Sequence, residues 1–410
     1  MKTVLYYGMG LLVLFALFLF PLSGCEEKEE QPKPKPQADT GPMVRVAGED
    51  WPDFEDDLDP ASLFNALAQS RVYLNRVPGS RVFEYGPDRY TAAELLDSLD
   101  TFEKLYRTHE RGTDLKEALV RNFILYQSVG SDTDHNVLCT GYYEPELQGS
   151  LTPSDQFKWP VYGLPGDLIT VDLGLFDSEL KGKTIRGRIE GRSLKPYFSR
   201  REIDREGRLN GRALELGWVA DPVALFFLHI QGSGRISLDG GDVLRVGYAG
   251  ANGRAYRSLG KYMIETERLA KENVSMQSIR AYLDQHPEEM AELLDYNASY
   301  VFFRVLDGDA VGNINVPLTP LRSVALDYRI FPKSALAWLQ CRKPVVADGN
   351  ISDWRPFSRF VMVQDTGGAI RGPGRLDLFW GHGTEAEISA GHMKENGRLY
   401  FLVKKQDPPH

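Results

Sequence analysis

The sequence of 410 residues has little cysteine, no paired metal-binding histidines and no excess of positive charge. Three cysteines are too few for a disulfide-rich scaffold, and the seven histidines form no His-Glu-x-x-His pair. We therefore expect neither a metal site nor a cofactor, and no phosphate-binding loop suggests otherwise. Lys and Arg number 48 against 57 Asp and Glu, for a formal net charge of -9, which argues against nucleic acid as the main partner.

The remaining composition is typical of a globular protein. Hydrophobic residues make up 42% and charged residues 26%, and at ~100–200 residues per domain the length predicts two or three domains. Glycine (39), tyrosine (19) and phenylalanine (20) are frequent, which favours short strands joined by tight turns.

The N-terminus carries a targeting signal. Lys2 precedes an apolar run, Leu5–Leu22, that is long enough to span a membrane as a helix. The run ends in Leu22–Cys25, and charged residues begin at Glu26. Small residues before a cysteine at this place resemble a bacterial lipobox, in which the chain is cut before the cysteine and the cysteine is lipidated. An ordinary signal peptide or signal anchor that happens to contain a cysteine is the alternative.

On the lipobox interpretation, residues 1–24 are a lipoprotein signal peptide and Cys25 is the lipidated residue. Residues 25–43 then form a flexible tether, because prolines alternate with polar residues there. The residue after the cysteine is Glu26 rather than Asp, so the resemblance implies the outer membrane, with the protein facing the periplasm.

The pattern along the rest of the chain changes twice. Up to Val129 it is mostly helical, with a capping box at Thr91–Glu94. Short strands follow, among them an expected strand at Ala224–Ile230, and then two helices between residues 256 and 296. From Tyr300 on, six short strands predict a small closed barrel. They are Val301–Phe303, Ser323–Leu326, Ala335–Leu339, Phe360–Val363, Leu376–Trp380 and Tyr400–Val403.

Aspartates stand out as candidates for chemistry. Asp377 interrupts an apolar strand and precedes Phe379 and Trp380, so we expect it to be partly desolvated. Desolvation raises the pKa of a carboxyl group, which a general acid at neutral pH requires. Asp365 and Asp327 each end an apolar strand. For these two, capping a turn is the ordinary structural alternative.

These residues also resemble a known family. Asp327, Asp365–Ile370 and Asp377 are similar to the three aspartates of the so-called three-Asp (3D) domain. Upstream, Gly141–Pro145, Gln231–Gly234 and Tyr248–Gly260 resemble the other half of the membrane-bound lytic murein transglycosylase A family. The resemblance covers Cys139 to about Val403.

The resemblance implies an α+β fold that is mainly β, with two domains and a groove between them. Residues 44–140 and 300–405 would form a double-psi β-barrel catalytic domain with N-terminal helices. Residues 141–299 would form an inserted, smaller, β-rich substrate-binding domain.

The resemblance also implies the substrate and the reaction. The family cleaves peptidoglycan glycan strands between N-acetylmuramic acid and N-acetylglucosamine, forming 1,6-anhydromuramic acid ends without water. Asp377 would be the single acid and base, Asp365 the second catalytic residue, and Asp327, Thr366, Gly367 and Gly368 would support them. The residues expected to bind sugar are Tyr142, Tyr143, Gln231, Gly232, Ser233, Tyr248, Asn252 and Trp380.

Two other functions stay open at this point. One is a peptidoglycan hydrolase that uses Asp377 with Asp365 or Glu144 as base. The other is a non-catalytic lipoprotein that binds glycan as a wall anchor. Expected partners are the glycan strands, the outer membrane through the lipid, and other cell-wall enzymes. Cys139 and Cys341 could form a disulfide in the periplasm or remain two buried thiols.

Overall fold

A computed structural model describes residues 41–406. The signal segment, Cys25 and most of the tether lie outside the described residues. Among residues 41–406, no helix is long and apolar enough to cross a membrane.

The predicted helical stretch near the N-terminus is confirmed. It contains α1 (Pro60–Arg76), α2 (Ala92–Thr108) and α3 (Thr113–Asn122), with a hairpin of β2 (Val82–Tyr85) and β3 (Asp88–Thr91) between the first two. The capping box forms as expected, because Thr91 and Glu94 bond each other's backbone N–H. One side of α2 packs on the strands that follow, with the rings of Phe102 and Phe360 4.8 Å apart.

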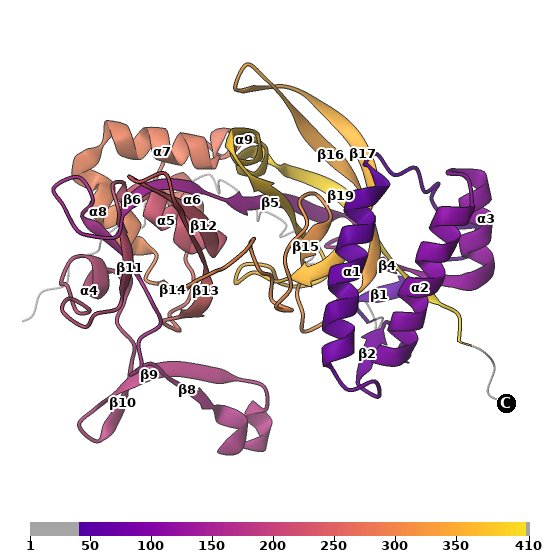
Figure 1. Cartoon of the computed structure of the whole chain (residues 1–410), viewed down its shortest axis with the longest axis horizontal. Coiled ribbons are helices and arrows are strands. Elements are labelled where there is room, and N and C mark those ends of the chain that lie inside the picture. The colour runs from indigo at the N-terminus through magenta and orange to yellow at the C-terminus, as the bar shows by residue number, and fades with distance from the viewer. Residues whose placement is uncertain (1–40, 407–410) are drawn as a thin grey trace, which may run out of the picture. The chain divides into compact units, whose positions relative to one another are not determined.

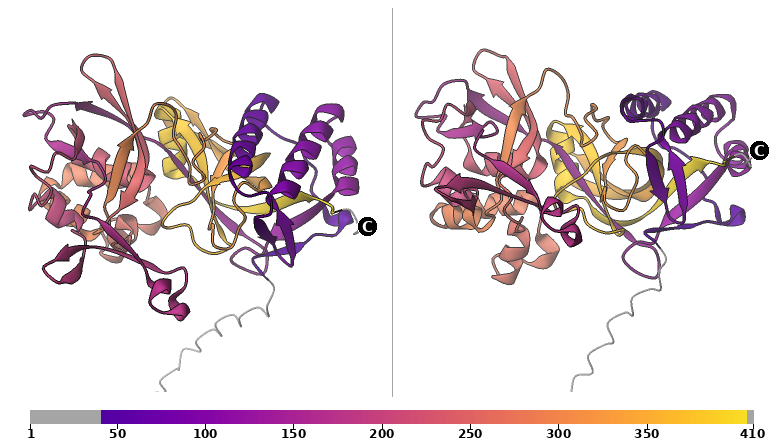
Figure 2. Two further views of the ribbon diagram at one scale, coloured as in Figure 1. Left: turned by 60° about the horizontal axis from the view of Figure 1, so that its bottom comes forward. Right: turned by 90° about the horizontal axis from the view of Figure 1, so that it is seen from below.

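The expected closed barrel is present and has six strands. In order around the ring they are β5 (Val137–Glu144), β19 (Lys394–Lys404), β16 (Leu336–Ala347), β17 (Asn350–Asp365), β15 (Ser323–Ala325) and β18 (Arg375–His382), which pairs back to β5. Two further strands, β4 (Phe123–Ser128) and β1 (Met43–Arg45), extend the sheet from β19. Both views of Figure 2 show the N-terminal helices beside these barrel strands. Closure leaves the ring itself without an unpaired edge.

One strand of the barrel differs from the prediction. The strand expected at Val301 forms as β14 (Val301–Val305), but it pairs with β13 (Val243–Ala251) in another sheet. The sixth barrel strand is β5, from the middle of the chain, which pairs in parallel with β18 and antiparallel with β19. Local patterning identifies strands but not their partners, so this exchange was not visible in the sequence.

The strand expected at Ala224–Ile230 is wrong, because this segment is a helix, α5 (Pro222–Gln231). Asp221 caps its start by accepting the backbone N–H of Val223, and Gly232 ends it in a left-handed conformation with φ 84°. The helix is buried on nearly every side. Its sequence is therefore apolar throughout and shows no helical period.

The second sheet contains six strands in the order β14-β13-β12-β6-β11-β7. The strands not yet given are β6 (Glu146–Ser150), β7 (Trp159–Tyr162), β11 (Glu215–Val219) and β12 (Ser233–Leu238). Leu225 and Leu228 of α5 pack on one face of this sheet, against Ile236 and Val246. Further along lie α6 (Leu259–Glu265), α7 (Met276–Gln285) and α8 (Pro287–Tyr296), which share a core with α5. Figure 1 shows these elements grouped around the sheet.

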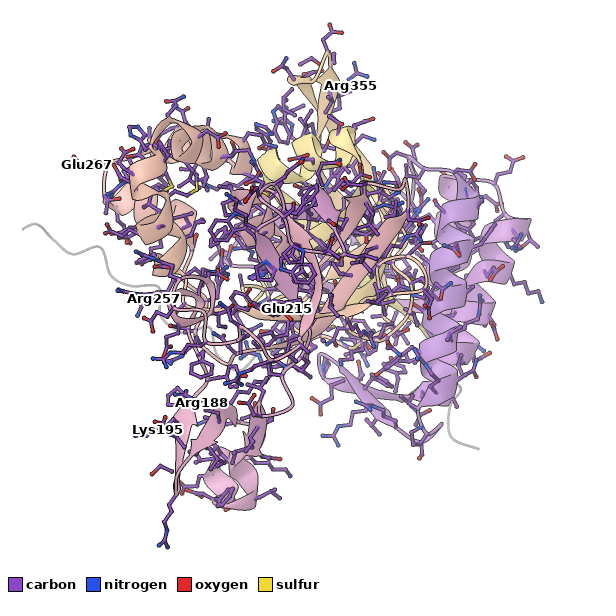
Figure 3. The ribbon with its side chains drawn as sticks, turned by 60° about the vertical axis from the view of Figure 1, so that its left-hand side comes forward. Arg188, Lys195, Glu215, Arg257, Glu267 and Arg355 are labelled. Atoms are coloured by element: carbon purple, nitrogen blue, oxygen red, sulfur yellow. The ribbon has the colours of Figure 1, made fainter. Side chains whose placement is uncertain are left out.

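Three smaller elements complete the described chain. A separate three-stranded sheet contains β8 (Ile169–Asp172), β9 (Thr184–Glu190) and β10 (Ser193–Pro196), and Figures 1 and 3 show it projecting away from the six-stranded sheet. The short helix α4 (Arg200–Asp204) follows it. After β18, α9 (Thr384–His392) packs against β5 and β18.

Candidate active site

Asp377 lies in the middle of β18, on the wall of the barrel. Its neighbours across the strands are Ala325 of β15 and Thr140 of β5. The side chain is half-buried, and its Oδ1 atom is buried without a hydrogen-bond partner among the described residues. Burial raises the pKa of Asp377 to about 6, Arg375 acts against this rise, and the charge of Asp365 adds to it. Asp377 can therefore hold a proton near neutral pH, as the sequence led us to expect.

Asp365 ends β17 and is the other cross-strand partner of Ala325. Both of its oxygens accept hydrogen bonds. Oδ2 accepts from the Tyr142 hydroxyl at 2.8 Å, and Oδ1 accepts from the backbone N–H of Asn313 at 2.9 Å. Burial raises the pKa of Asp365, and the bonds from Thr366 and Tyr142 oppose that rise. Hydrogen-bond donors thus hold both oxygens of Asp365, whereas Oδ1 of Asp377 has no hydrogen-bond partner among the described residues.

Asp327 has a different electrostatic character from the other two. It is fully buried, and Arg329 donates two hydrogen bonds to it at 2.8 and 2.6 Å. The backbone N–H of Gly372 donates another at 2.9 Å. These bonds, above all that from Arg329, lower the pKa of Asp327 to about 2. Asp327 is therefore always ionised at neutral pH, and it holds the loop before β18 against the end of β15.

The residues after Asp365 form the turn that was expected. Thr366 donates its hydroxyl to the carbonyl of Leu326 at 2.8 Å, which ties the turn to the residues that follow β15, next to Asp327. At Gly367 an added Cβ would lie 2.9 Å from Ile370, while at Gly368 it would meet nothing within 4 Å. Gly367 is thus needed for packing, and Gly368 leaves an open approach.

Sequence reasoning missed two neighbours of Asp377. Arg375 lies two residues earlier on β18, and its Nη2 is 3.5 Å from the Thr140 hydroxyl. Tyr256 comes from the chain between β13 and α6. Its pKa is raised by burial, and the charges of Arg375 and Asp377 also act on it. The Tyr248–Gly260 motif contained this tyrosine, but nothing in the sequence placed it beside Asp377.

The predicted sugar-binding tyrosines Tyr142 and Tyr143 are both largely buried. The ring of Tyr142 packs at 5.2 Å from that of Phe379. The backbone N–H of Tyr143 donates to Gln231 at 3.0 Å, so the end of α5 is bonded to β5. These contacts gather three of the predicted residues around the junction of the two sheets.

The other predicted sugar ligands lie in contrasting surroundings. Asn252 is 0% exposed, and its amide donates to the carbonyls of Phe198 and Ala298 at 2.8 and 2.9 Å. It supports the backbone in this structure, and its contact with sugar stays a prediction. Ser233 is buried and Gly232 caps α5, whereas Tyr248 is exposed.

Trp380 follows Phe379 on the strand that carries Asp377. It is half-buried, and its Nε1 atom has no hydrogen-bond partner among the described residues. Gly141 makes room for it, because an added Cβ there would lie 2.6 Å from Nε1. The indole thus rests on the backbone of β5, close to the strand pair that holds Asp377.

Glu144 is the other carboxyl group considered as a base. It is buried at the end of β5, and its Oε1 has no hydrogen-bond partner within residues 41–406. Burial raises its pKa to about 7, while Arg235 opposes the rise. The charges that shift the pKa of Asp377 are those of Arg375 and Asp365, and Glu144 is not among them.

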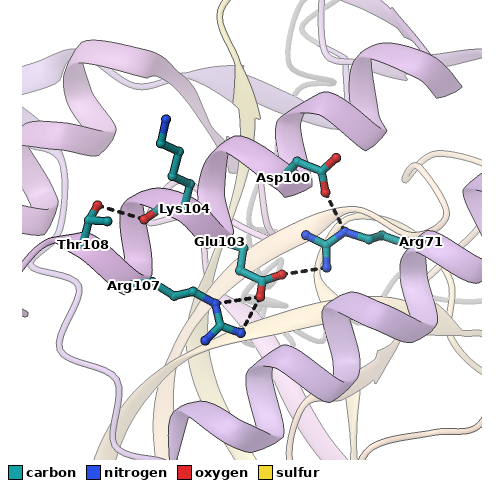
Figure 4. A pocket seen from close by; sticks show the side chains of 6 residues that line it. All are labelled: Arg71, Asp100, Glu103, Lys104, Arg107 and Thr108. Atoms are coloured by element: carbon teal, nitrogen blue, oxygen red, sulfur yellow. Dashed lines mark hydrogen bonds and ion pairs between the residues drawn. The ribbon is translucent and has the colours of Figure 1, made fainter.

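Two cavities of the described chain lie elsewhere. One, of about 370 Å³, lies over α1 and α2, where Glu103 pairs with Arg71 at 2.7 Å and with Arg107 at 2.6 Å (Figure 4). The other, of about 610 Å³, is lined by β2, β3 and residues 328–333. Neither is lined by Asp327, Asp365 or Asp377, so the groove expected between the domains remains a prediction.

Cys139 and Cys341, which were considered as a disulfide pair, are both free thiols. Cys139 lies on β5 and Cys341 on β16, and both are buried. Gly397 of β19 lies against both, since an added Cβ there would lie 2.8 Å from the Cys139 sulfur and 3.1 Å from Cβ of Cys341. The pKa of Cys139 is raised, chiefly by the Cys341 thiol.

These features define a class of protein: an enzyme built on a closed six-stranded barrel, with acidic side chains gathered at one place on its wall. Family models match most of this region, one described as the MltA specific insert domain at residues 138–304 and one as the 3D domain at residues 322–403. A membrane-bound lytic murein transglycosylase A from Vibrio cholerae is 34% identical over 283 residues, covering 68% of each chain. The chain belongs to the membrane-bound lytic murein transglycosylase A family, and the resemblance drawn from its motifs is confirmed.

Solved structures agree with this assignment. A crystal structure of a membrane-bound lytic murein transglycosylase from Agrobacterium tumefaciens is 30% identical, with a TM-score of 0.72, and covers 88% of this chain and 97% of that chain. A crystal structure of E. coli MltA with bound chitohexaose is 26% identical, with a TM-score of 0.68, and covers 90% of this chain and 96% of that chain.

Proposed function

We propose that this protein is a lytic transglycosylase that cleaves peptidoglycan strands between N-acetylmuramic acid and N-acetylglucosamine, with Asp377 as the single acid and base. The observation that carries the proposal is the state of Asp377: a pKa of about 6, and a buried oxygen with no hydrogen-bond partner among the described residues. Such a group can give a proton to a leaving oxygen and later accept one. The related enzyme with bound chitohexaose supports a glycan as substrate.

In the proposed reaction, protonated Asp377 donates its proton to the glycosidic oxygen that leaves C1 of N-acetylmuramic acid. The C6 hydroxyl of the same sugar attacks C1, and ionised Asp377 takes the proton from that hydroxyl. The product is a 1,6-anhydro ring, no water is consumed, and Asp377 ends protonated as it began. Attack within one sugar has a large effective-molarity advantage, so a second protein carboxylate is not needed.

The hydrogen bonds of Asp365 and Asp327 favour this scheme over a hydrolase that uses either of them as its base. Donors that hold a carboxylate stabilise its ionised form and make it a weaker base toward water. Both oxygens of Asp365 already accept hydrogen bonds, from Tyr142 and Asn313. Asp327 is held by Arg329 and Gly372. We therefore assign Asp365 to the positioning of Tyr142 and the field around Asp377, and Asp327 to the loop.

The product identifies the reaction. Purified peptidoglycan is digested in water enriched in heavy oxygen, and the muropeptides are analysed by mass spectrometry. We expect 1,6-anhydro ends, without heavy oxygen at C1, that are one water lighter than hydrolytic products. Addition of a chelator should leave the rate unchanged. Reducing ends that carry heavy oxygen would instead identify a hydrolase, with Asp365 and then Glu144 as bases to test, and uncut chains would identify a binding protein.

We further propose that the mature protein begins at Cys25 and is held in the outer membrane by lipid on that residue, facing the periplasm. The lipobox-like Leu22–Cys25 and the proline-containing tether support this address. Cys25→Ser should abolish incorporation of labelled palmitate and leave a longer precursor. Incorporation that continued in this variant would refute lipidation at Cys25.

A further inference from the structure

The three-stranded sheet of β8, β9 and β10, together with the turn between β8 and β9, spans Ile169–Pro196 and is called the arm here. The strands are antiparallel, with β9 in the centre. Figure 3 shows the arm as a separate projection, with Arg188 and Lys195 labelled on it. The sheet is small, and no helix covers it as α5 covers the six-stranded sheet.

One face of the arm is apolar and exposed. Residues directly opposite each other in an antiparallel sheet share a face, as do alternate residues along a strand. Val171 pairs with Ile185 and Leu194 with Ile189, which places these side chains on the same face of β9. The large exposed hydrophobic side chains of this face are Ile169, Ile185, Ile189 and Leu194.

The turn at the end of the arm presents two further apolar side chains. Leu175 is 83% exposed and Phe176 is 79% exposed, more than any other large hydrophobic side chain of the described chain. The turn has an ordered conformation, because Asp172 accepts the N–H of Gly174 and Asp177 accepts that of Glu179, each at 2.9 Å. The structure therefore holds Leu175 and Phe176 outward. An exposed apolar patch of this kind marks an interaction surface.

The opposite face of the arm is polar and bonded to the rest of the protein. Arg186 donates to the Tyr248 hydroxyl at 3.3 Å and to the carbonyl of Ala251 at 3.0 Å. Arg188 donates to the carbonyl of Pro196 at 2.6 Å and lies over the ring of Phe198. These contacts fix the polar face inward and leave the apolar face available to a partner.

The charge around the apolar face identifies the chemistry of that partner. Three exposed cations in the turns of the arm take part in no ion pair of the described chain: Lys181, Lys183 and Arg192. Lys195 lies opposite Arg188, on the polar face. The arm carries six Lys and Arg residues against four Asp and Glu residues, so its charge balance is positive. Glu190 pairs with Arg188 at 3.1 Å, while Asp172, Asp177 and Glu179 lie in the turn between β8 and β9. The whole chain carries -9, so unpaired positive charge beside apolar side chains is a local departure. Leucine and phenylalanine flanked by lysine and arginine suit an anionic lipid surface.

The length of the tether agrees with this partner. Between Cys25 and the first described residue, Gly41, lie 15 residues, whose full extension reaches about 50 Å. A lipid on Cys25, as in the proposed function, would keep the body within this distance of a bilayer. A weak surface contact would then suffice to hold the arm on the membrane, because tethering raises its effective concentration there.

We propose that the apolar face and turn of the arm dock on a lipid bilayer that contains anionic headgroups. Leu175 and Phe176 enter the interface, and Lys181, Lys183 and Arg192 contact the headgroups. The inference rests on the proposed lipidation only for its setting in the cell. Docking by the arm is a property of residues 40–410 and can be measured without the lipid.

The test uses the chain from Thr40 to His410, since this range is one compact unit and holds every described sheet and core cluster. Its sedimentation is measured with phosphatidylcholine vesicles, with and without one quarter phosphatidylglycerol. The double variant Leu175→Ser and Phe176→Ser is compared with Leu151→Ser, which changes an exposed leucine outside the arm. Molecular mass in solution and digestion of peptidoglycan without vesicles are recorded for each protein.

We expect binding to the anionic vesicles, with a partition coefficient at least about tenfold lower in the double variant, since two large apolar side chains no longer enter the interface. Leu151→Ser should bind like the unchanged chain, and added salt should weaken binding. Absence of binding, or equal binding by the double variant, would overturn the proposal. A doubled mass that the double variant loses would assign the face to a second copy. Vesicle binding and peptidoglycan digestion are separate measurements. If the proposed reaction failed, the vesicle experiment would still test docking by the arm.

Discussion

Asp365 and Asp377 are the two cross-strand partners of a single residue, Ala325: Asp365 in a parallel pairing and Asp377 in an antiparallel one. The two carboxyl groups thus come from strands on either side of a short third strand. The charge of one raises the pKa of the other. This arrangement leads to the predictions that follow.

Replacement of Asp377 by Asn should abolish the acid while keeping the shape of the site. We expect turnover of peptidoglycan to fall by at least about 10²-fold, the usual scale for loss of general acid–base help. Binding of insoluble peptidoglycan, measured by co-sedimentation, should be unchanged. Digestion at the unchanged rate would show that Asp377 is not the acid.

The pH dependence of kcat/KM should show that the charge of Asp365 raises the pKa of Asp377. If protonated Asp377 starts the reaction, kcat/KM falls as the pH rises through about 6, the pKa of that group. Asp365→Asn removes a negative charge that raises this pKa, so the falling limb should move to lower pH. Glu144→Gln is the matched control, because Glu144 does not act on the pKa of Asp377, and its limb should stay in place. A limb that moved in Glu144→Gln but not in Asp365→Asn would contradict the assignment.

Asp377→Asn, which should lower activity, should raise the free energy of unfolding at pH 7. Because the folded pKa, about 6, lies above the ordinary 3.8, the folded protein binds the proton more tightly than the unfolded chain. The free energy of unfolding should therefore decrease between pH 4 and pH 7, by up to about 3 kcal/mol from this group. Asp377→Asn should be the more stable protein at pH 7 and lose this advantage at pH 4. Denaturant unfolding at both pH values measures it, and an equal difference at the two would refute the desolvation argument.

Asp327 should show the reverse dependence. Its pKa is lowered to about 2, so its ionised form stabilises the fold above the ordinary value, and that stability is lost as the pH falls toward 2. We expect Asp327→Asn to lower the free energy of unfolding at pH 7 by up to about 2 kcal/mol. The difference from the unchanged protein should shrink at pH 3. The exposed Asp239→Asn serves as a control and should change little at either pH.

Gly141 should tolerate no side chain. An added Cβ would lie 2.6 Å from Nε1 of Trp380 and 2.8 Å from Cα of Ala390, and the second of these contacts is with backbone. Gly141→Ala should lower stability by about 1–3 kcal/mol, as overpacking does, and should displace the indole. Tryptophan fluorescence and thermal unfolding would measure both effects. Gly368→Ala, where the added Cβ meets nothing within 4 Å, should alter neither.

Local features of the sequence predicted local features of the structure. Asp377 was identified because an acid interrupts an apolar strand ahead of two aromatic residues, and such a position is desolvated whatever the strand pairs with. The capping box at Thr91 was equally visible, because its two bonds join residues three apart. The barrel was expected from repeated short strands.

Features that depend on distant partners were not visible. The helix α5 is surrounded by core, so its residues are apolar on every side and lack a helical period. The barrel closes with β5, almost 180 residues before its first other strand, β15. The charge of Asp377 acts on Tyr256 only because the fold brings the loop of Tyr256 there. None of these three features produces a recognisable pattern in the residues next to it in the sequence.

The origin of β5 decides how the protein can be divided. The 3D domain match, residues 322–403, holds the other five barrel strands but not β5, which lies ahead of the insert sheet. A fragment cut at those limits would leave the edges of β18 and β19 unpaired, and exposed edges of this kind invite pairing with other chains. The strand that carries Asp377, β18, is one of these two edges. The three-aspartate segment is thus a unit of sequence but not of folding, because its barrel is complete only when β5 pairs with β18 and β19.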